Sequence, residues 1–121
     1  MKYHESEEMY LETILLLTES GKEIRSVDIA TELNYSRASV SRAVGLLQKK
    51  EYIYIENGFI KFTELGLKKA NEIFERHEII TDLLTKIGVS KELAEENACR
   101  IEHVISPELL SYFKEFLKKN Y

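Results

Sequence analysis

The fold is decided by residues 25–50, which read RSVDIATELNYSRASVSRAVGLLQKK. Two short stretches with apolar residues at helical spacing flank Asn34-Tyr35, which we expect to form a tight turn. A short helix, a tight turn and a second helix make up the helix-turn-helix arrangement. The side chains that the two helices are expected to bury are Val27, Ile29, Ala30 and Leu33 in the first and Val40, Val44 and Leu47 in the second.

The outward face of the second helix is polar and basic, which favours contact with nucleic acid. Serine and arginine at a helix start suit hydrogen bonds to phosphates and to base edges in a major groove. The alternative is an ordinary helical hairpin whose arginines are merely solvated. Residues 25–63 carry a net charge of +2, whereas residues 1–24 carry −4 and residues 64–121 carry −2, which favours the first interpretation. The predicted DNA-contacting residues of this helix are its N-cap Ser36, Arg37, Ala38, Ser39, Ser41 and Arg42.

A β-hairpin pattern follows directly. Tyr52–Glu56 alternates as a strand, Asn57-Gly58 is the pair that favours a two-residue type I′ turn, and Phe59–Thr63 returns. A hairpin in this position is the wing of a winged helix-turn-helix. Lys61 on the wing is expected to reach a DNA phosphate, with a solvated lysine as the alternative.

The rest of the chain is predicted to be helical. The fold class is therefore mainly α, with a winged helix-turn-helix DNA-binding domain in residues 1–63 and an all-helical domain in residues 64–121. The expected helix boundaries are a start at Ser6 and a stop near Gly21, a long helix from the cap Thr63 to about Ile87 with Gly88 after it, and two further helices starting at Ser90 and at Ser106-Pro107.

Cys99, Glu102 and His103 stand at i, i+3 and i+4, which is one face of a helix, and Glu95 joins that face one turn earlier. Thiolate, carboxylate and imidazole suit a divalent transition metal. A cysteine–histidine pair can equally be a nucleophile and its base, and the plain alternative is a core cysteine with a solvated histidine. The apolar residues expected on the opposite, core-facing side are Leu93, Ala94, Ala98, Ile101, Val104 and Ile105.

The last predicted helix carries a broad apolar stripe that is too aromatic to face water. Packing against a second copy of the chain is the simplest explanation, so we expect a homodimer. The stripe consists of Leu109, Leu110, Tyr112, Phe113, Phe116 and Leu117.

Composition limits the class of protein. Of 121 residues, 44% are hydrophobic and 31% are charged, which is typical of a globular protein with a real core. No apolar run approaches the roughly 20 residues that span a membrane, and the N-terminus MKYHESEE lacks signal-peptide character. One cysteine excludes an internal disulfide and fits a reducing compartment, so the expected location is cytoplasmic.

Four short motifs together identify a family. They are Glu8-Met9-Tyr10-Leu11, Ser39-Val40-Ser41, Arg76-His77 and Ala98–Val104, which reads ACRIEHV. With these motifs the chain resembles, over residues 5–118, the iron- and manganese-dependent repressors of the diphtheria toxin repressor and manganese transport regulator family. Its length matches the two-domain members that lack a C-terminal SH3-like domain.

The resemblance implies a metal site. Met9, Cys99, Glu102 and His103 match the primary site of the iron-type members, and His77 matches a ligand of the second site. Glu12 matches a ligand of the manganese branch only. Glu95 stands where the iron-type second site has a histidine, and Thr81 where it has a carboxylate. The implied cofactor is Fe2+ or Mn2+, with Co2+, Ni2+ or Zn2+ as further ions that can bind in vitro.

The function that the resemblance implies is metal-dependent repression of metal homeostasis genes by a homodimer on double-stranded operator DNA. A first alternative is a winged-helix regulator that ignores metal and senses redox state through Cys99. A second is an enzyme that uses Cys99 and His103 as nucleophile and base, but the chain lacks a glycine-rich oxyanion loop. We therefore expect a regulator and not an enzyme.

Overall fold

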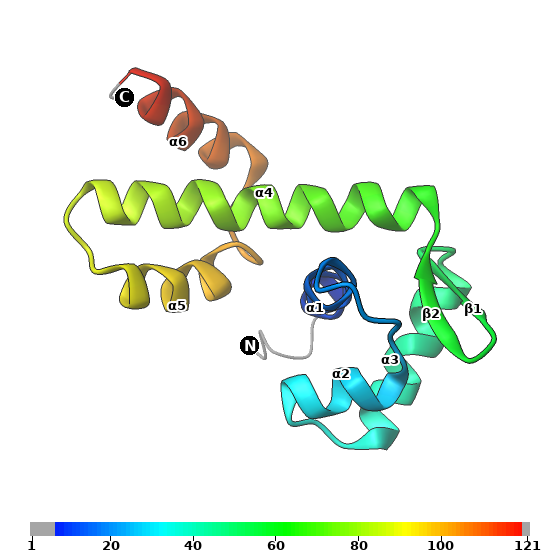
Figure 1. Cartoon of the computed structure of the whole chain (residues 1–121). Helices are drawn as coiled ribbons and strands as arrows, with labels where there is room; N and C mark the ends of the chain where they lie inside the picture. Colours follow the sequence, from blue (N-terminus) through cyan, green and yellow to red (C-terminus); the bar gives the residue numbers. More distant parts are fainter. Residues whose placement is uncertain (1–6, 120–121) are drawn as a thin grey trace. The chain divides into compact units, whose positions relative to one another are not determined.

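The computed structural model describes residues 7–119 and confirms a mainly α fold with one small hairpin (Figure 1). The predicted N-cap Ser6 lies outside the described residues. Two compact units divide the chain, Met1–Asn71 and Glu72–Tyr121, and the predicted domain division after residue 63 stays a prediction. The elements are α1 (Glu7–Glu19), α2 (Ser26–Leu33), α3 (Arg37–Lys49), β1 (Ile53–Glu56), β2 (Phe59–Phe62), α4 (Glu64–Lys86), α5 (Lys91–Ile101) and α6 (Pro107–Lys119).

The helix-turn-helix of the first unit forms as predicted. Asn34 takes the left-handed conformation, with φ at 57°, and ends α2. The Ser36 hydroxyl caps α3 by accepting a hydrogen bond from the Ser39 backbone N–H at 3.1 Å. The core side of α3 is buried as predicted. One expectation for α2 is wrong, because Val27 is 43% exposed. It lies about 200° around the helix from the buried Ile29, so it cannot face the same core.

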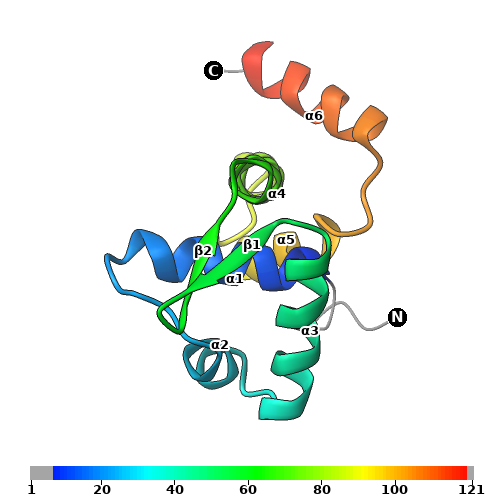
Figure 2. The ribbon, with the colours of Figure 1, turned by 90° about the vertical axis from the view of Figure 1, so that its right-hand side faces the viewer.

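The wing is an antiparallel hairpin that pairs Ile53 with Phe62 and Glu56 with Phe59 (Figure 2). Asn57 and Gly58 both have positive φ, at 54° and 84°, as the predicted type I′ turn requires. The hairpin also joins the segment before α2 through a bridge between Ile24 and Ile60. The wing is therefore anchored to the helix-turn-helix.

The junction between the wing and α4 needs a glycine. The Thr63 hydroxyl donates to the Glu51 carbonyl at 2.6 Å and accepts from the Gly66 N–H at 3.0 Å, which confirms Thr63 as the cap of α4. A Cβ added to Gly66 would lie 1.8 Å from the Tyr52 carbonyl oxygen. The helix start therefore packs directly on the backbone before β1.

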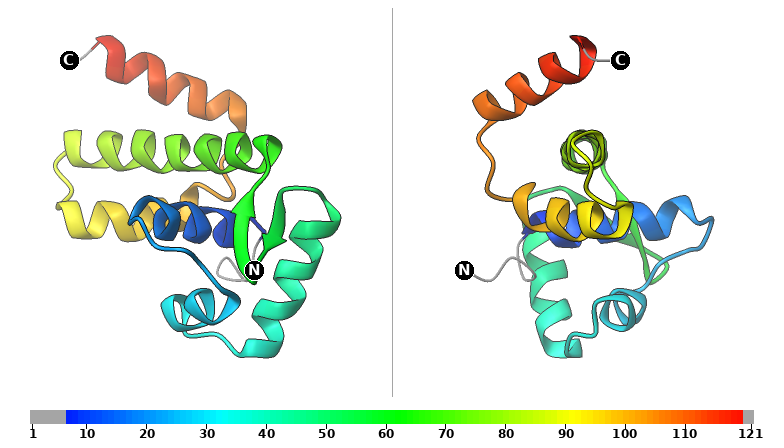
Figure 3. Two further views of the ribbon diagram at one scale, coloured as in Figure 1. Left: turned by 45° about the vertical axis from the view of Figure 1, so that its right-hand side comes forward. Right: turned by 90° about the vertical axis from the view of Figure 1, so that its left-hand side faces the viewer.

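The second unit contains the remainder of α4 together with α5 and α6, which lie on different sides of α4 (Figure 3). Gly88 ends α4 with φ at 106°. Ser90 and Ser106 cap the next two helices as predicted. Ala94 and Ala98 of α5 are fully buried, and Lys114 of α6 forms an ion pair with Glu75 of α4 at 2.8 Å.

Two predictions about the core face of α5 are wrong. Leu93 and Val104 are about half exposed. The helix ends at Ile101, so Val104 lies beyond it in a turn where helical periodicity no longer sets direction, and Leu93 lies in the first turn. Among residues 7–119, no helix is long and apolar enough to cross a lipid bilayer.

Candidate functional site

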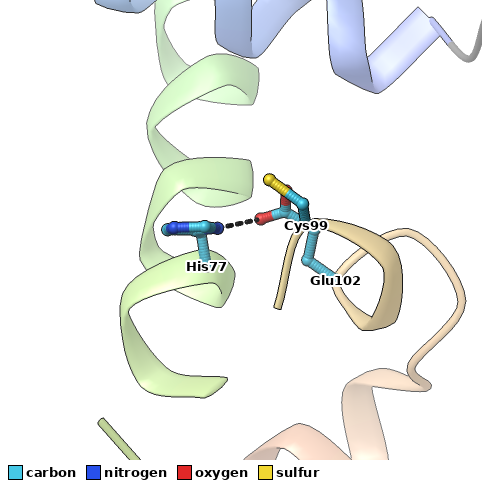
Figure 4. Close-up of side chains that lie close together, drawn as sticks. All are labelled: His77, Cys99 and Glu102. Carbon is cyan, nitrogen blue, oxygen red and sulfur yellow. Dashed lines mark ion pairs between the residues drawn. The ribbon is translucent and has the colours of Figure 1, made fainter. Parts of the chain in front are cut away.

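Three side chains that can bind a metal converge in the second unit. His77 comes from α4, Cys99 from the last turn of α5, and Glu102 from the residue that caps α5. One ligand atom from each lies within 4.8 Å of the other two (Figure 4). The distance from His77 Nδ1 to Glu102 Oε2 is 3.4 Å. Residues far apart in sequence therefore present nitrogen, sulfur and oxygen to one point.

Local structure accounts for this convergence. The backbone keeps its helical conformation through Glu102, with φ at −59° and ψ at −25°, so Cys99 and Glu102 share one face. The Arg76 guanidinium holds the end of α5 by donating to the Glu102 backbone carbonyl at 2.8 Å. The Phe74 ring stacks on the His77 ring, with 6.4 Å between centroids and 18° between planes. Both contacts come from residues of α4 that lie within three positions of His77 in the sequence.

Glu102 is the unusual member of this group, because its side chain is 0% exposed. We expected it to lie off the core face, and that expectation is wrong. Neither carboxylate oxygen accepts a hydrogen bond from a described residue. The rings of His77 and His103 each lie 3.4 Å from one of its oxygens. Burying a carboxylate without hydrogen bonds costs folding free energy. Positive charge beside Glu102 would therefore stabilise this site.

The donor set fits a divalent transition metal. Imidazole nitrogen, thiolate sulfur and carboxylate oxygen together match borderline divalent ions rather than Ca2+ or Mg2+, which prefer oxygen alone. A cation at this point would offset the negative charge of Glu102, whose carboxylate oxygens accept no hydrogen bond from residues 7–119. Cys99 is exposed, so its thiol can be reached from solvent.

The other predicted ligands have different surroundings. His103 lies beside Glu102, whereas Glu95 is exposed and outside the His77, Cys99 and Glu102 group. Met9 and Glu12 lie on α1 in the first unit, where Met9 is half-buried and Glu12 is buried. The assignment of these residues as ligands stays a prediction. Sequence analysis missed Phe74, because a stacking contact with His77 on the same helix leaves no motif.

The predicted DNA-contacting face lies on α3. Arg37, Ala38, Ser41 and Arg42 are exposed, and Ser39 is half-buried. The Ser39 hydroxyl accepts hydrogen bonds from Ser36 at 3.0 Å and from Arg42 at 3.4 Å. The N-terminal half of α3 thus offers polar and basic side chains to solvent. On the wing, the Lys61 Nζ atom lies 3.7 Å from the Glu23 Oε1 atom, which makes an ion pair.

At the C-terminal end of α3, Lys50 donates a hydrogen bond to the Glu7 carboxylate, and this bond raises the pKa of Lys50.

Comparison with known proteins covers nearly the whole chain. A family model described as the N-terminal DNA binding domain of iron dependent repressors matches residues 2–57. A second model, described as the metal binding and dimerisation domain of iron dependent repressors, matches residues 63–120.

Individual relatives agree with these matches. An uncharacterised HTH-type transcriptional regulator of Methanocaldococcus jannaschii is 32% identical over 118 residues, covering 95% of this chain and 94% of the relative. The transcriptional regulator MntR of Escherichia coli is 35% identical over 112 residues, which cover 92% of this chain and 72% of MntR. In the crystal structure of IdeR from T. acidophilum, the sequence is 29% identical to this chain and the TM-score is 0.83. The match covers 93% of this chain but only 54% of the IdeR chain, so this chain spans about half of that longer protein.

Proposed function

The chain belongs to the iron-dependent repressor family, and we propose that it represses genes of metal homeostasis when Fe2+ or Mn2+ is bound. The members of this family are transcriptional regulators. Membership therefore favours this function over an enzyme, and over a regulator that ignores metal and uses Cys99 as a redox sensor. The single cysteine fits action in a reducing cytoplasm.

The observation that carries the proposal is the buried Glu102 carboxylate, which lies close to His77 and the Cys99 thiol and accepts no hydrogen bond from any described residue. These three residues would hold the metal, with His103, Met9 and Glu12 as the further ligands that the family resemblance implies. A bound divalent cation would place positive charge directly against this carboxylate. Glu95 is the weakest of the predicted ligands, because its side chain is exposed and outside the group.

The mixture of ligands bears on which metal activates the protein. Sulfur from Cys99 and Met9 favours Fe2+ over Mn2+, because Mn2+ prefers oxygen-rich sites. Glu12 and Glu102 add oxygen and keep Mn2+ binding possible. We expect Fe2+, or its test-tube substitute Co2+, to act at lower free concentration than Mn2+, with Ni2+ and Zn2+ as further ions that bind in vitro.

The DNA-binding half of the proposal rests on the exposed polar face of α3. Ser36, Arg37, Ala38, Ser39, Ser41 and Arg42 would contact a major groove, and Lys61 on the wing would contact a phosphate. A homodimer would place two such helices about 34 Å apart, or a multiple of that, on a palindromic operator. Arg42→Ala should weaken operator binding by about 1–3 kcal/mol if Arg42 reads a base edge. A gel-shift titration that finds unchanged affinity contradicts the assignment.

The test of the whole proposal is metal-dependent DNA binding. An operator would first be selected from random double-stranded DNA with metal-loaded protein. Fluorescence anisotropy of that operator would then be measured against buffered free Fe2+, Co2+ and Mn2+ without oxygen, because the Cys99 thiol can oxidise. The proposal predicts binding with metal, loss with chelator, and weaker activation by every metal in Cys99→Ala.

A matched pair of variants locates the site. Glu102→Gln removes the buried carboxylate, whereas Glu95→Gln removes an exposed one on the same helical segment. We expect activation to fail in the first and to persist in the second. If chelator leaves the affinity of the unmutated protein for its operator unchanged, the proposed function is wrong.

A further inference from the structure

The side chain of Tyr35 contacts two consecutive residues at the start of α1. Its hydroxyl group donates a hydrogen bond to the Met9 thioether, with 3.9 Å between the oxygen and Sδ. Its ring meets the ring of Tyr10 edge-on, with 6.1 Å between centroids and 62° between planes. Tyr10 is buried. The ring contact therefore belongs to the core of the first unit. The hydroxyl contact instead reaches Met9, which matches a metal ligand of the iron-type family members.

Tyr35 also occupies the turn that precedes α3. The left-handed backbone of Asn34 comes immediately before it, and the α3 cap Ser36 comes immediately after. The Tyr35 N–H donates to the Ala30 carbonyl at 3.1 Å. The helix-turn-helix therefore holds the Tyr35 backbone, and the contact with the buried Tyr10 ring sets the direction of the side chain.

We propose that Tyr35, which lies in the turn before α3, is a positioning residue for the Met9 thioether. The inference rests on the proposed function, in which Met9 is a ligand. A thioether sulfur has two lone pairs, so it can accept the O–H and still offer the other pair to a metal. Methionine has three rotatable bonds, and the Tyr35 hydroxyl restricts the sulfur to one of the positions that these bonds allow.

The test is Co2+ binding to the intact chain carrying Tyr35→Phe, which removes the hydroxyl and keeps the ring against Tyr10. Optical titration is expected to show the Co2+ dissociation constant rising about two- to tenfold, the range that a single hydrogen bond supports. The sulfur-to-cobalt absorption band should change as well. Saturating Co2+ should restore full operator affinity, because the helix-turn-helix is intact. Tyr54→Phe, which removes the hydroxyl of an exposed wing tyrosine, should leave Co2+ binding unchanged.

A double-mutant cycle shows whether the effect passes through Met9. In a Met9→Leu background, Tyr35→Phe should cause no further loss of Co2+ affinity. An equal loss of Co2+ affinity in the unmutated and Met9→Leu backgrounds overturns the proposal. Unchanged Co2+ binding in Tyr35→Phe alone also overturns it, even if the melting temperature of that variant in chelator falls.

The same cycle separates this failure from failure of the proposed function. If the unmutated protein binds no Co2+, the proposed function is wrong and the inference about Tyr35 is overturned with it. If Met9→Leu binds Co2+ as tightly as the unmutated protein, Met9 is not a ligand and the role of Tyr35 is overturned, while metal-dependent repression through the other ligands stands.

Discussion

The largest fully buried side chains of the first unit are aliphatic, whereas the second unit buries a carboxylate as deeply as its isoleucines. In the first unit these side chains are Leu11, Ile14, Ile29, Val40 and Leu47, and in the second they are Ile73, Ile80 and Glu102. Apolar burial stabilises a fold in any buffer, but a buried carboxylate opposes folding unless something compensates its charge. The aliphatic core of the first unit is therefore suited to be a constant scaffold, whereas the buried Glu102 of the second unit is suited to respond to a cation.

The largest expected effect tests the scaffold. Leu47→Ala removes a buried side chain from α3 and should lower the free energy of unfolding by about 2–5 kcal/mol. The loss should be the same with metal or with chelator, as measured by urea unfolding. Its neighbour Leu46 is 59% exposed, so Leu46→Ala should change stability by only about 0.5 kcal/mol or less. Equal losses in the two variants would mean that α3 does not pack as described.

The next effect tests the cation response of the second unit. Free Co2+ at about 100 times its dissociation constant should stabilise the unmutated protein by about 2.7 kcal/mol. Glu102→Gln should lose most of this gain, because a neutral amide binds a cation poorly. In chelator the same variant should be at least as stable as the unmutated protein, since a buried charge has been removed. Urea unfolding in both buffers measures this, with Glu95→Gln as the control that keeps the metal-dependent gain.

A smaller effect concerns the apolar stripe of α6. Tyr112 is 67% exposed in the single chain, although the matched family domain is one of metal binding and dimerisation. Tyr112→Glu should raise the dimer dissociation constant at least tenfold, which is about 1.4 kcal/mol, by placing a charge in an apolar contact. Sedimentation at graded protein concentrations measures this. Ser111→Glu, on the polar side of α6, should leave the dimer intact, and an equally intact dimer in Tyr112→Glu would exclude the stripe from the interface.

The smallest effect compares two helix ends, one in each unit. After α3, the N–H groups of Glu51 and Tyr52 donate to the Gln48 and Leu47 carbonyls, each at 3.0 Å. Gly88 and Val89 form the same pattern after α4. The left-handed residue is Glu51 in one motif, with φ at 65°, and Gly88 in the other. Relief of its backbone strain should let Glu51→Gly stabilise the protein by about 1 kcal/mol.

The reverse substitution supplies the control for these helix ends. Gly88→Ala places a Cβ at φ 106°, so it should destabilise by about 1 kcal/mol or more. Thermal unfolding of both variants measures the pair. A loss of stability in Glu51→Gly would mean that the Glu51 side chain makes contacts that outweigh its backbone strain.

Local signals in the sequence sufficed for the helix-turn-helix, the wing and the helix caps. Asn57-Gly58 forms the predicted turn because only a few residue types accept positive φ at both positions. Ser36, Thr63, Ser90 and Ser106 cap helices because a hydroxyl group at that position satisfies a free backbone N–H. Such interactions span a few residues, so the order of residues along the chain already contains them.

Tertiary structure alone decided what is buried and which donors meet. Helical periodicity placed Val27 in the core and Glu102 outside it, and both predictions were wrong because burial depends on what packs against a helix. No pattern in the sequence indicated that position 66 requires glycine, because the requirement arises only where α4 packs against the Tyr52 backbone. Helical spacing named Cys99 and Glu102 as donors, and the family resemblance added His77. Their convergence required α4 and α5 to pack side by side, which is a long-range contact that local periodicity does not encode.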